Sequence, residues 1–111
     1  MTSKLNIVFA GLSITSSWGN GHATTYRSLI KALQKRGHNI LFLERDTEWY
    51  AGNRDMPHPP FCETIIYNSL QELKNNYTER IRNADIVVFG SFVPEGIEAA
   101  SWIIENASRT A

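Results

Sequence analysis

The feature that most constrains the fold of this chain is the pattern of its first part. Two apolar runs there are separated by an amphipathic stretch. Residues 5–12 are nearly all apolar and rich in Ile, Val and Phe, which is typical of a strand buried on both faces. Residues 40–43 form the second such run, and Gly37 before it is suited to a left-handed helix cap. The residues between the runs that recur at helical spacing are Tyr26, Leu29, Ile30 and Leu33. The sequence therefore predicts a βαβ unit with parallel strands and a right-handed crossover.

The alternation of strand and helix continues along the chain. Residues 64–67 and 86–90 predict a third and a fourth strand. Residues 45–62 between the second and third strands are irregular, and Asp46 or Thr47 is suited to cap one short helical turn there. The order β-α-β-loop-β-α-β-α indicates an α/β fold, a Rossmann-like doubly wound parallel sheet.

Two later helices have recognisable starts. Ser69 and Glu72 fit a capping box. Pro94 and Glu95 suit the first turn of a last helix. No strand is predicted after that helix, so we expect residues 1–111 to form a single partial Rossmann-like domain, incomplete at its C-terminus and with an open sheet edge.

Composition excludes several function classes. The chain has 111 residues, 42% of them apolar, and a formal net charge of +0, which gives no basic face for nucleic acid. Cys62 is the only cysteine, so a reduced, cytoplasmic setting is expected. No run approaches the roughly 20 apolar residues of a membrane span. Three scattered histidines and one cysteine have no metal-ligand spacing, so no metal site is expected.

The segment TSSWGNGHATT, residues 15–25, is the strongest candidate for a binding loop. It joins the first strand to the first helix, at the sheet edge where open α/β sheets bind ligands. Its glycines let the backbone approach a ligand closely, and the helix N-terminus that follows favours anions. Trp18 is suited to stack on a sugar ring or, alternatively, to cover the core.

Residues 19–24 also read G-x-G-x-x-T, with Glu44 near the place of a ribose-binding acid. The third glycine of a dinucleotide fingerprint is missing, and the first lies several residues beyond the strand. A fragment of an NAD-dependent oxidoreductase is therefore only an alternative. No G-K-[ST] sequence occurs, which excludes a P-loop.

Residues 7–27 resemble the opening of bacterial glycosyltransferases of the CgeB/spore-protein type. The resemblance continues through residues 36–38, 42–46, 49–50 and 53–55 and so covers nearly the whole chain. It implies the N-terminal, acceptor-side half of a GT-B enzyme that transfers a sugar from a nucleotide-sugar to an unidentified acceptor. The donor-binding domain of such an enzyme has no counterpart in this chain. We therefore expect a fragment that is inactive alone, and whether it is an enzyme stays open.

The resemblance implies that His22 is a general base. The alternative is a structural role, in which His22 packs or caps at the start of the first helix. No cofactor is expected in this chain, and the nucleotide-sugar donor belongs to the full enzyme. The candidate substrate-binding residues are Trp18, Gly19, Asn20, Gly21, Thr24, Glu44 and Arg45.

The main alternative is a non-catalytic Rossmann-like or flavodoxin-like ligand-binding module. The expected partners are a sugar acceptor and a nucleotide-sugar, the latter through a further domain. Self-association through the open sheet edge is also expected.

Overall fold

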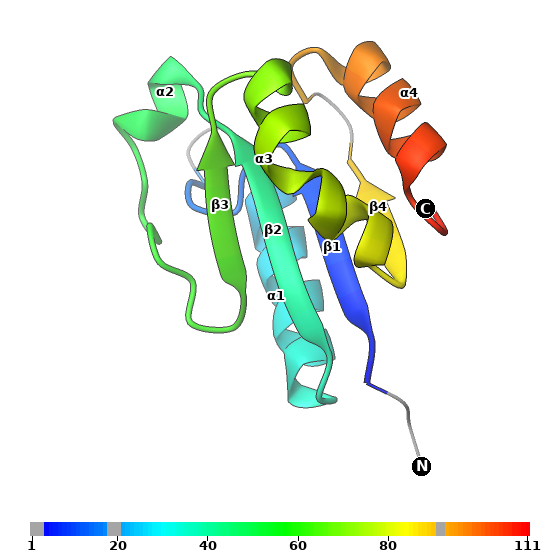
Figure 1. Ribbon diagram of the computed structural model, residues 1–111. Helices are drawn as coiled ribbons and strands as arrows, with labels where there is room; N and C mark the ends of the chain where they lie inside the picture. The colour runs from blue at the N-terminus through cyan, green and yellow to red at the C-terminus, as the bar shows by residue number, and fades with distance from the viewer. Residues whose placement is uncertain (1–3, 18–20, 91–92) are drawn as a thin grey trace.

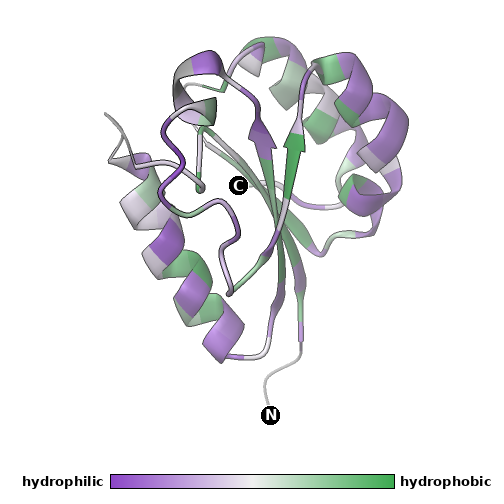
Figure 2. Ribbon diagram, turned by 90° about the vertical axis from the view of Figure 1, so that its left-hand side faces the viewer, coloured by the Kyte–Doolittle hydropathy of each residue, from purple (hydrophilic) through white to green (hydrophobic). Residues whose placement is uncertain are grey.

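The computed structural model describes residues 4–17, 21–90 and 93–111. One parallel sheet of four strands has the order β3-β2-β1-β4, with α1 on one face and α3 and α4 on the other (Figure 1, Figure 2). This order and layering confirm the predicted Rossmann-like α/β fold. The strands are β1 (Asn6–Gly11), β2 (Asn39–Arg45), β3 (Glu63–Tyr67) and β4 (Ile86–Phe89). The helices are α1 (His22–Lys35), α2 (Glu48–Ala51), α3 (Leu70–Asn83) and α4 (Gly96–Asn106).

Alternate residues of the central strands enter two separate cores, because successive side chains of a strand point to opposite faces. On the α1 face, the Phe9 and Phe42 rings of paired positions stack with centroids 6.5 Å apart, over Ile30 of the helix. On the other face, α3 and α4 cover the second core. Its fully buried members include Leu43, Leu73, Ile81, Val87 and Ile103. Burial on both faces explains why the strands read as nearly continuous apolar runs.

The helix ends follow the sequence in part. Ser69 Oγ accepts a hydrogen bond from the Glu72 amide at 3.1 Å, which confirms the predicted cap of α3. Gly37 has φ +93° after α1, as the predicted left-handed cap requires. The expected first turn at Pro94 and Glu95 is wrong. Glu95 has φ 59° and is the N-cap of a helix that begins at Gly96.

The connection from β2 to β3 has only one short helix. Of the two residues expected to cap a short helical turn, Thr47 is the N-cap of the four-residue α2, but its side chain makes no cap hydrogen bond among the described residues. Residues 52–62 have no regular structure. No long helix therefore joins these two parallel strands, and among the described residues α1 is the only long helix on its face.

The last residues return to the sheet beside β4. Val87 bridges Thr110 in parallel, the Val87 amide donates to the Arg109 carbonyl, and the Phe89 amide donates to the Ala111 carbonyl, each at 2.9 Å. As expected, no strand is described after α4, but this isolated bridge pairs part of the edge that the sequence predicts to be open. Three residues are too short a segment to show any periodic sequence signal.

Candidate functional site

The carboxyl ends of all four strands lie at one edge of the sheet, and the order of the strands reverses between β1 and β4. The chain leaves β1 toward α1 and β2 on one side, whereas β4 pairs with β1 on the other side. Ligands of open α/β sheets bind at such a switch point, because the loops on either side of it diverge. The residues around this point therefore define the candidate site.

Two glycines and a tyrosine pack together at the switch point. Gly11 ends β1 and Gly90 follows β4, and the Gly90 amide donates to the Ala10 carbonyl at 2.8 Å. The Tyr26 ring of α1 lies so close that a Cβ on Gly11 would be 2.7 Å from its Cζ. Burial raises the pKa of the Tyr26 phenol. The close approach fixes α1 against both strands at the edge where a ligand would bind.

Glu44 near the end of β2 is fully buried and holds the start of the β1–α1 loop. Its Oε1 accepts from Ser13 Oγ at 3.1 Å, from the Ile14 amide at 2.8 Å and from the Thr15 amide at 3.1 Å. Its Oε2 accepts from Thr15 Oγ1 at 2.7 Å and lies 3.6 Å from the Arg54 guanidinium. Amides that could surround a bound anion therefore surround the protein's own carboxylate instead.

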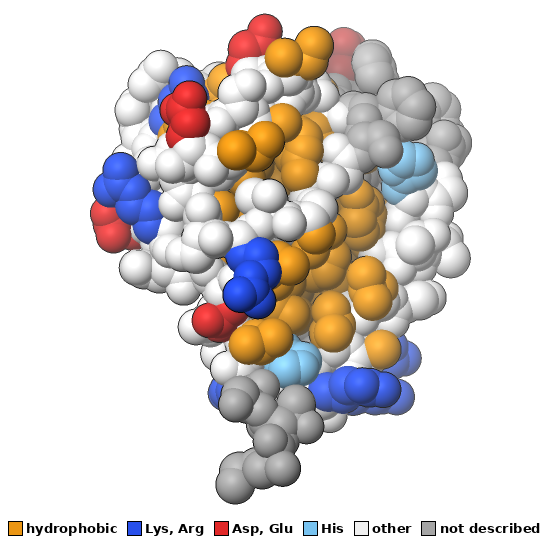
Figure 3. Space-filling model, turned by 90° about the vertical axis from the view of Figure 1, so that its right-hand side faces the viewer, with side chains coloured by type: hydrophobic (Ala, Val, Ile, Leu, Met, Phe, Trp, Pro, Cys, Tyr) orange, Lys and Arg blue, Asp and Glu red, His pale blue; other side chains and the backbone are white. Residues whose placement is uncertain are grey.

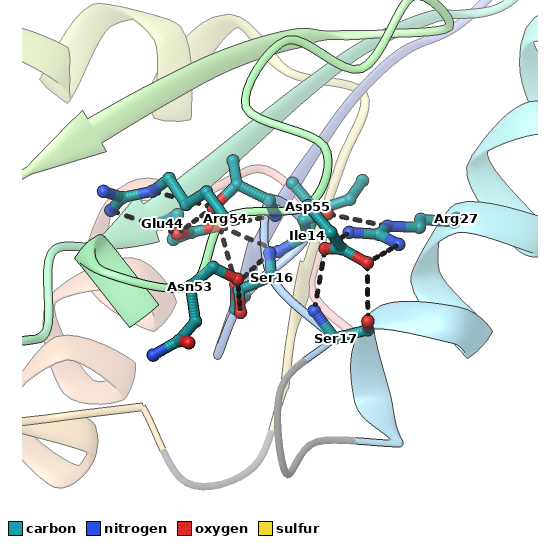
Figure 4. A network of polar contacts seen from close by, with 10 residues as sticks. Ile14, Ser16, Ser17, Arg27, Glu44, Asn53, Arg54 and Asp55 are labelled. Carbon is teal, nitrogen blue, oxygen red and sulfur yellow. Dashed lines mark hydrogen bonds and ion pairs between the residues drawn. The ribbon is translucent and has the colours of Figure 1, made fainter. Parts of the chain in front are cut away.

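The segment after α2 holds the same loop from outside (Figure 4). Ser16 Oγ donates to the Asn53 carbonyl at 2.6 Å, and the Met56 amide donates to the Thr15 carbonyl at 2.9 Å. Arg54 Nε donates to Thr15 Oγ1 at 3.0 Å. The irregular connection between β2 and β3 thus supports the β1–α1 loop.

Asp55 links the loop to α1. The Arg27 guanidinium donates to both carboxylate oxygens of Asp55, at 2.8 and 3.3 Å, and Arg27 Nε donates to the Ile14 carbonyl. The Ser17 amide and hydroxyl also donate to Asp55. The Arg27 and Ser17 hydrogen bonds hold the pKa of Asp55 well below its usual range. The loop as far as Ser17 is therefore attached to β2, to the segment after α2 and to α1.

The N-terminus of α1 begins beyond this anchored loop. Gly21 at the N-cap is exposed and has no side chain to cap the helix, and the first turn contains no acidic residue. Thr24 and Thr25 are exposed in that turn. The first amides of a helix have no partner within the helix, and the helix dipole favours an anion there. This helix end is suited to hold a phosphate or carboxylate group.

Arg45 and Glu95 form the opposite side of the edge. Their side chains are 3.0 Å apart, and Glu95 reaches Arg45 from its left-handed backbone position. Arg45 Nε and Thr47 Oγ1 are buried and have no hydrogen-bond partner among the described residues. Burial also raises the pKa of nearby Tyr67 to about 12.

The structure brings together several of the predicted site residues. Gly21, His22 and Thr24 share the first turn of α1, where the half-buried His22 ring meets Tyr26 edge-on with centroids 6.5 Å apart. Glu44 lies inside the fold beneath the β1–α1 loop, and Arg45 faces Glu95. The other predicted residues, Trp18, Gly19 and Asn20, lie outside the described residues.

Thr15 belongs to the predicted binding loop, but sequence reasoning did not assign Ser13, Arg27 and Arg54 to the site. The only available signal was a run of hydroxyl residues directly after a buried strand, which suggests that a partner exists for them inside the fold. The hydroxyls of Ser13 and Thr15 both donate to one buried carboxylate, that of Glu44, which lies 31 and 29 residues further along the chain. These hydroxyl residues do not recur at a regular spacing, so the sequence gives no indication of how far along the chain their partner lies.

The opposite edge of the sheet has a different character. An open hollow of about 720 Å³ lies at the amino ends of the strands, and Ile40, Phe61 and Cys62 are part of its wall. Burial raises the pKa of the Cys62 thiol, which disfavours a reactive thiolate there. Within the described part of the chain no group of three or more His, Cys, Asp or Glu residues is placed to hold a metal ion. None of the helices described is long and apolar enough to cross a membrane.

Comparison with known proteins gives no family. No family model matches the sequence. No curated protein matches it either. A solved structure that the fold resembles is the DNA/pantothenate metabolism flavoprotein from Streptococcus pneumoniae, with a TM-score of 0.45 and 13% sequence identity. The match covers 97% of this chain and 54% of that chain, so this chain spans about half the length of the flavoprotein. A likeness at this level concerns the Rossmann-like fold alone.

Proposed function

We propose that this chain is a Rossmann-like ligand-binding module and that it binds a phosphate-bearing small molecule at the carboxyl edge of β1 and β4. The observation that carries the proposal is the N-terminus of α1, which has Gly21 at the N-cap, no acidic residue in the first turn and no side-chain cap among the described residues, at the end of a loop anchored on three sides. Among the described residues, no atom lies within 4 Å of the position that a Cβ on the exposed Gly21 would take. A phosphate group there would accept from those amides and from exposed threonine hydroxyls.

The same geometry disfavours a dinucleotide held through Glu44. An acid that binds ribose hydroxyls needs free acceptor positions at the sheet edge. The Glu44 carboxylate is fully buried and accepts four hydrogen bonds from residues 13–15. We therefore assign it to positioning the loop and not to contacting a ligand.

The acceptor-side half of a glycosyltransferase is the second candidate. Its support is that described residues from three of the segments that carry the family resemblance, residues 7–27, 42–46 and 53–55, form one connected network although the segments are far apart in sequence. His22 is the first residue of α1, the helix whose Arg27 belongs to that network. In this function it would accept the proton of an acceptor hydroxyl.

The test is an amide NMR titration with pyrophosphate, UDP, a UDP-sugar and NAD. The proposal expects the largest shifts at residues 21–25 with each of the four, since all carry phosphate. Two matched variants localise the site. Gly21→Asp places a carboxylate at the helix N-terminus and should abolish binding by repulsion. Gly21→Ala adds only a methyl group, which meets no described atom within 4 Å, and should preserve binding.

The outcomes separate the candidates. Shifts that persist unchanged in Gly21→Asp would place binding elsewhere and overturn the proposal, as would the absence of shifts with every phosphate compound. Binding of free glycosides but not of pyrophosphate would favour the acceptor-side glycosyltransferase. In that case His22→Gln, which keeps hydrogen bonding but not basicity, should leave glycoside binding intact.

A further inference from the structure

Two side chains hold the chain where it enters β1. The Leu5 amide donates to His38 Nδ1 at 3.1 Å, and the Asn6 amide donates to Asp85 Oδ2 at 2.7 Å. Backbone amides of a sheet ordinarily donate to carbonyl oxygens, which do not titrate. A ring nitrogen of histidine accepts a hydrogen bond only while it carries no proton. The attachment of Leu5 therefore depends on the protonation state of His38.

The His38 ring takes the place of a backbone carbonyl in the ladder between β1 and β2. The Asn39 amide donates to the Leu5 carbonyl at 2.9 Å, one position before the first paired residues, Asn6 and Asn39. By the pattern of a parallel ladder, the Leu5 amide would donate to the carbonyl of residue 37. Gly37 instead has the left-handed backbone that ends α1, with φ +93°. The side chain of the next residue supplies the acceptor in its stead.

This hydrogen bond requires a neutral ring. Because His38 Nδ1 accepts, the proton of the neutral imidazole is on Nε2. A second proton would have to go to Nδ1, where it would point at the Leu5 amide, so that two donors would face each other. His38 is only 9% exposed, which leaves water little access to replace the lost partner. A protonated ring and an attached Leu5 amide therefore exclude each other.

The other titratable groups near His38 do not change their charge where histidine titrates. The wall of the hollow at the amino ends of the strands contains His38 together with Lys4, Cys62, Glu63 and Arg80. The Arg80 hydrogen bond lowers the pKa of Glu63, and this pair is 2.8 Å apart. Burial raises the pKa of the Cys62 thiol. His38 is therefore the group in this wall that gains charge in mild acid.

The remaining charges around this end of the molecule are mostly basic. Figure 3 shows Lys and Arg side chains gathered at its lower end, where α1 ends with Lys35 and is followed by Arg36. Both side chains are exposed. The acid of the neighbouring turn, Asp85, already accepts from the Asn6 amide. A positive charge on His38 therefore meets basic groups and acids that already have partners.

We propose that residues 4–5 are released from the start of β2 when His38 takes up a proton, and that they are attached while its ring is neutral. The strand itself stays in the sheet, because the Asn6 amide donates to Asp85 and the Asn39 side chain donates to Asn6 Oδ1 at 3.0 Å. Release therefore changes the wall of the hollow, from which residue 4 departs, and leaves the core in place. The proposal is independent of what binds at the carboxyl edge of the sheet.

An NMR titration of the whole chain from about pH 8 to about pH 5 tests this coupling. The ring nitrogens of His38 and the amide of Leu5 are followed in the same sample. Both should change with one common midpoint. The backbone order parameter of Leu5 should fall from about 0.85, the value of rigid backbone, to below about 0.6. The amides of Asn6 and Ile7 should stay ordered throughout.

Three variants assign the transition to the ring. His38→Asn places an amide oxygen near the position of Nδ1 and does not titrate, so Leu5 should stay ordered at both ends of the pH range. His38→Leu removes the acceptor, so Leu5 should be mobile at both ends. His58→Asn removes an exposed histidine elsewhere and should leave the transition unchanged.

The titration of the unchanged chain is decisive even if a variant does not fold. An ordered Leu5 at a pH where the ring resonances show a protonated His38 would overturn the proposal. So would a His38 that stays neutral down to about pH 5. The same loss of order in His38→Asn would assign the release to another group.

Discussion

The hydroxyl oxygen of Tyr26 lies only 1.8 Å from the position that a Cβ on Gly90 would take. The same ring also contacts Gly11, at the end of the neighbouring strand. A residue of α1 thus packs against the ends of β1 and β4 at the switch point of the sheet. A side chain at either glycine must displace the ring.

Replacement of Gly90 should show how much the contact with the Tyr26 hydroxyl contributes to stability. Gly90→Ala should lower the free energy of unfolding by about 1–3 kcal/mol, because the methyl group overlaps the Tyr26 hydroxyl. Tyr26→Phe removes that hydroxyl and should recover part of the loss in the double variant, measured by urea unfolding. Gly11→Ala is the matched control, since its methyl group would meet ring carbons of Tyr26 and Phe42 at 2.7 to 2.8 Å. If Tyr26→Phe restored the same free energy of unfolding to Gly11→Ala as to Gly90→Ala, the overlap with the Tyr26 hydroxyl would not explain the loss.

Glu44→Gln should be strongly destabilising although it preserves shape. The amide nitrogen of glutamine is a donor and would face donors of residues 13–15, and Arg54 would lose its buried partner. We expect a loss of about 3 kcal/mol in urea unfolding. Glu105→Gln on the exposed surface of α4 serves as the control and should change stability by less than about 0.5 kcal/mol. Similar losses in the two variants would rule out the special role of the buried carboxylate.

Asp55 should make the free energy of unfolding depend on pH in the acid range. The Arg27 and Ser17 hydrogen bonds lower its pKa in the folded state, so the unfolded chain binds more protons at this group. The stabilisation is complete above the unfolded pKa of about 3.9 and is lost as the pH falls toward the lower folded value. The advantage of the unchanged protein over Asp55→Asn, about 1 kcal/mol at neutral pH, should therefore shrink in acid. Urea unfolding of both proteins at successive pH values measures this difference in stability. A difference that grows toward low pH would contradict the prediction.

Backbone strain at Glu95 is measurable with two small substitutions. Glu95 is the only described residue other than glycine with a positive φ, and its carboxylate pairs with Arg45. Glu95→Gly and Glu95→Ala both remove the ion pair, but only glycine adopts this conformation without a Cβ clash. The glycine variant should therefore be more stable than the alanine variant by about 1–2 kcal/mol in thermal or urea unfolding. Equal stabilities would mean that the backbone relaxes at this position.

The regular elements were predictable because burial imposes a period on the sequence. The apolar runs of residues 5–12 and 40–43 correspond to β1 and β2, and the apolar residues at helical spacing between them lie in α1. Local chemistry also identified the cap at Ser69 and the left-handed Gly37. These features depend on residues within one or two turns of each other.

The candidate site was less predictable because its contacts are distant in sequence. The loop from Ser13 to Ser17 is held by Glu44, by residues 53–55 and by Arg27 through individual hydrogen bonds with no repeat. An acidic residue at the end of an apolar run is usually solvated, and nothing local indicates that Glu44 is fully buried. The left-handed backbone of Glu95 at the N-cap of α4 was not predicted for a related reason. Glu95 pairs with Arg45, which lies 50 residues earlier in the chain.

The buried Glu44 carboxylate also affects how a ligand would bind. Folding itself orders residues 13–17 around this group, so association beside them does not have to immobilise the loop. An ordered side chain spares about 0.5–1.5 kcal/mol of conformational entropy at the moment of binding. The expected calorimetric signature is a small entropic penalty together with a heat capacity change that reflects the ligand's own apolar surface. A residue that no ligand touches would thus set the thermodynamics of recognition at the edge of the sheet.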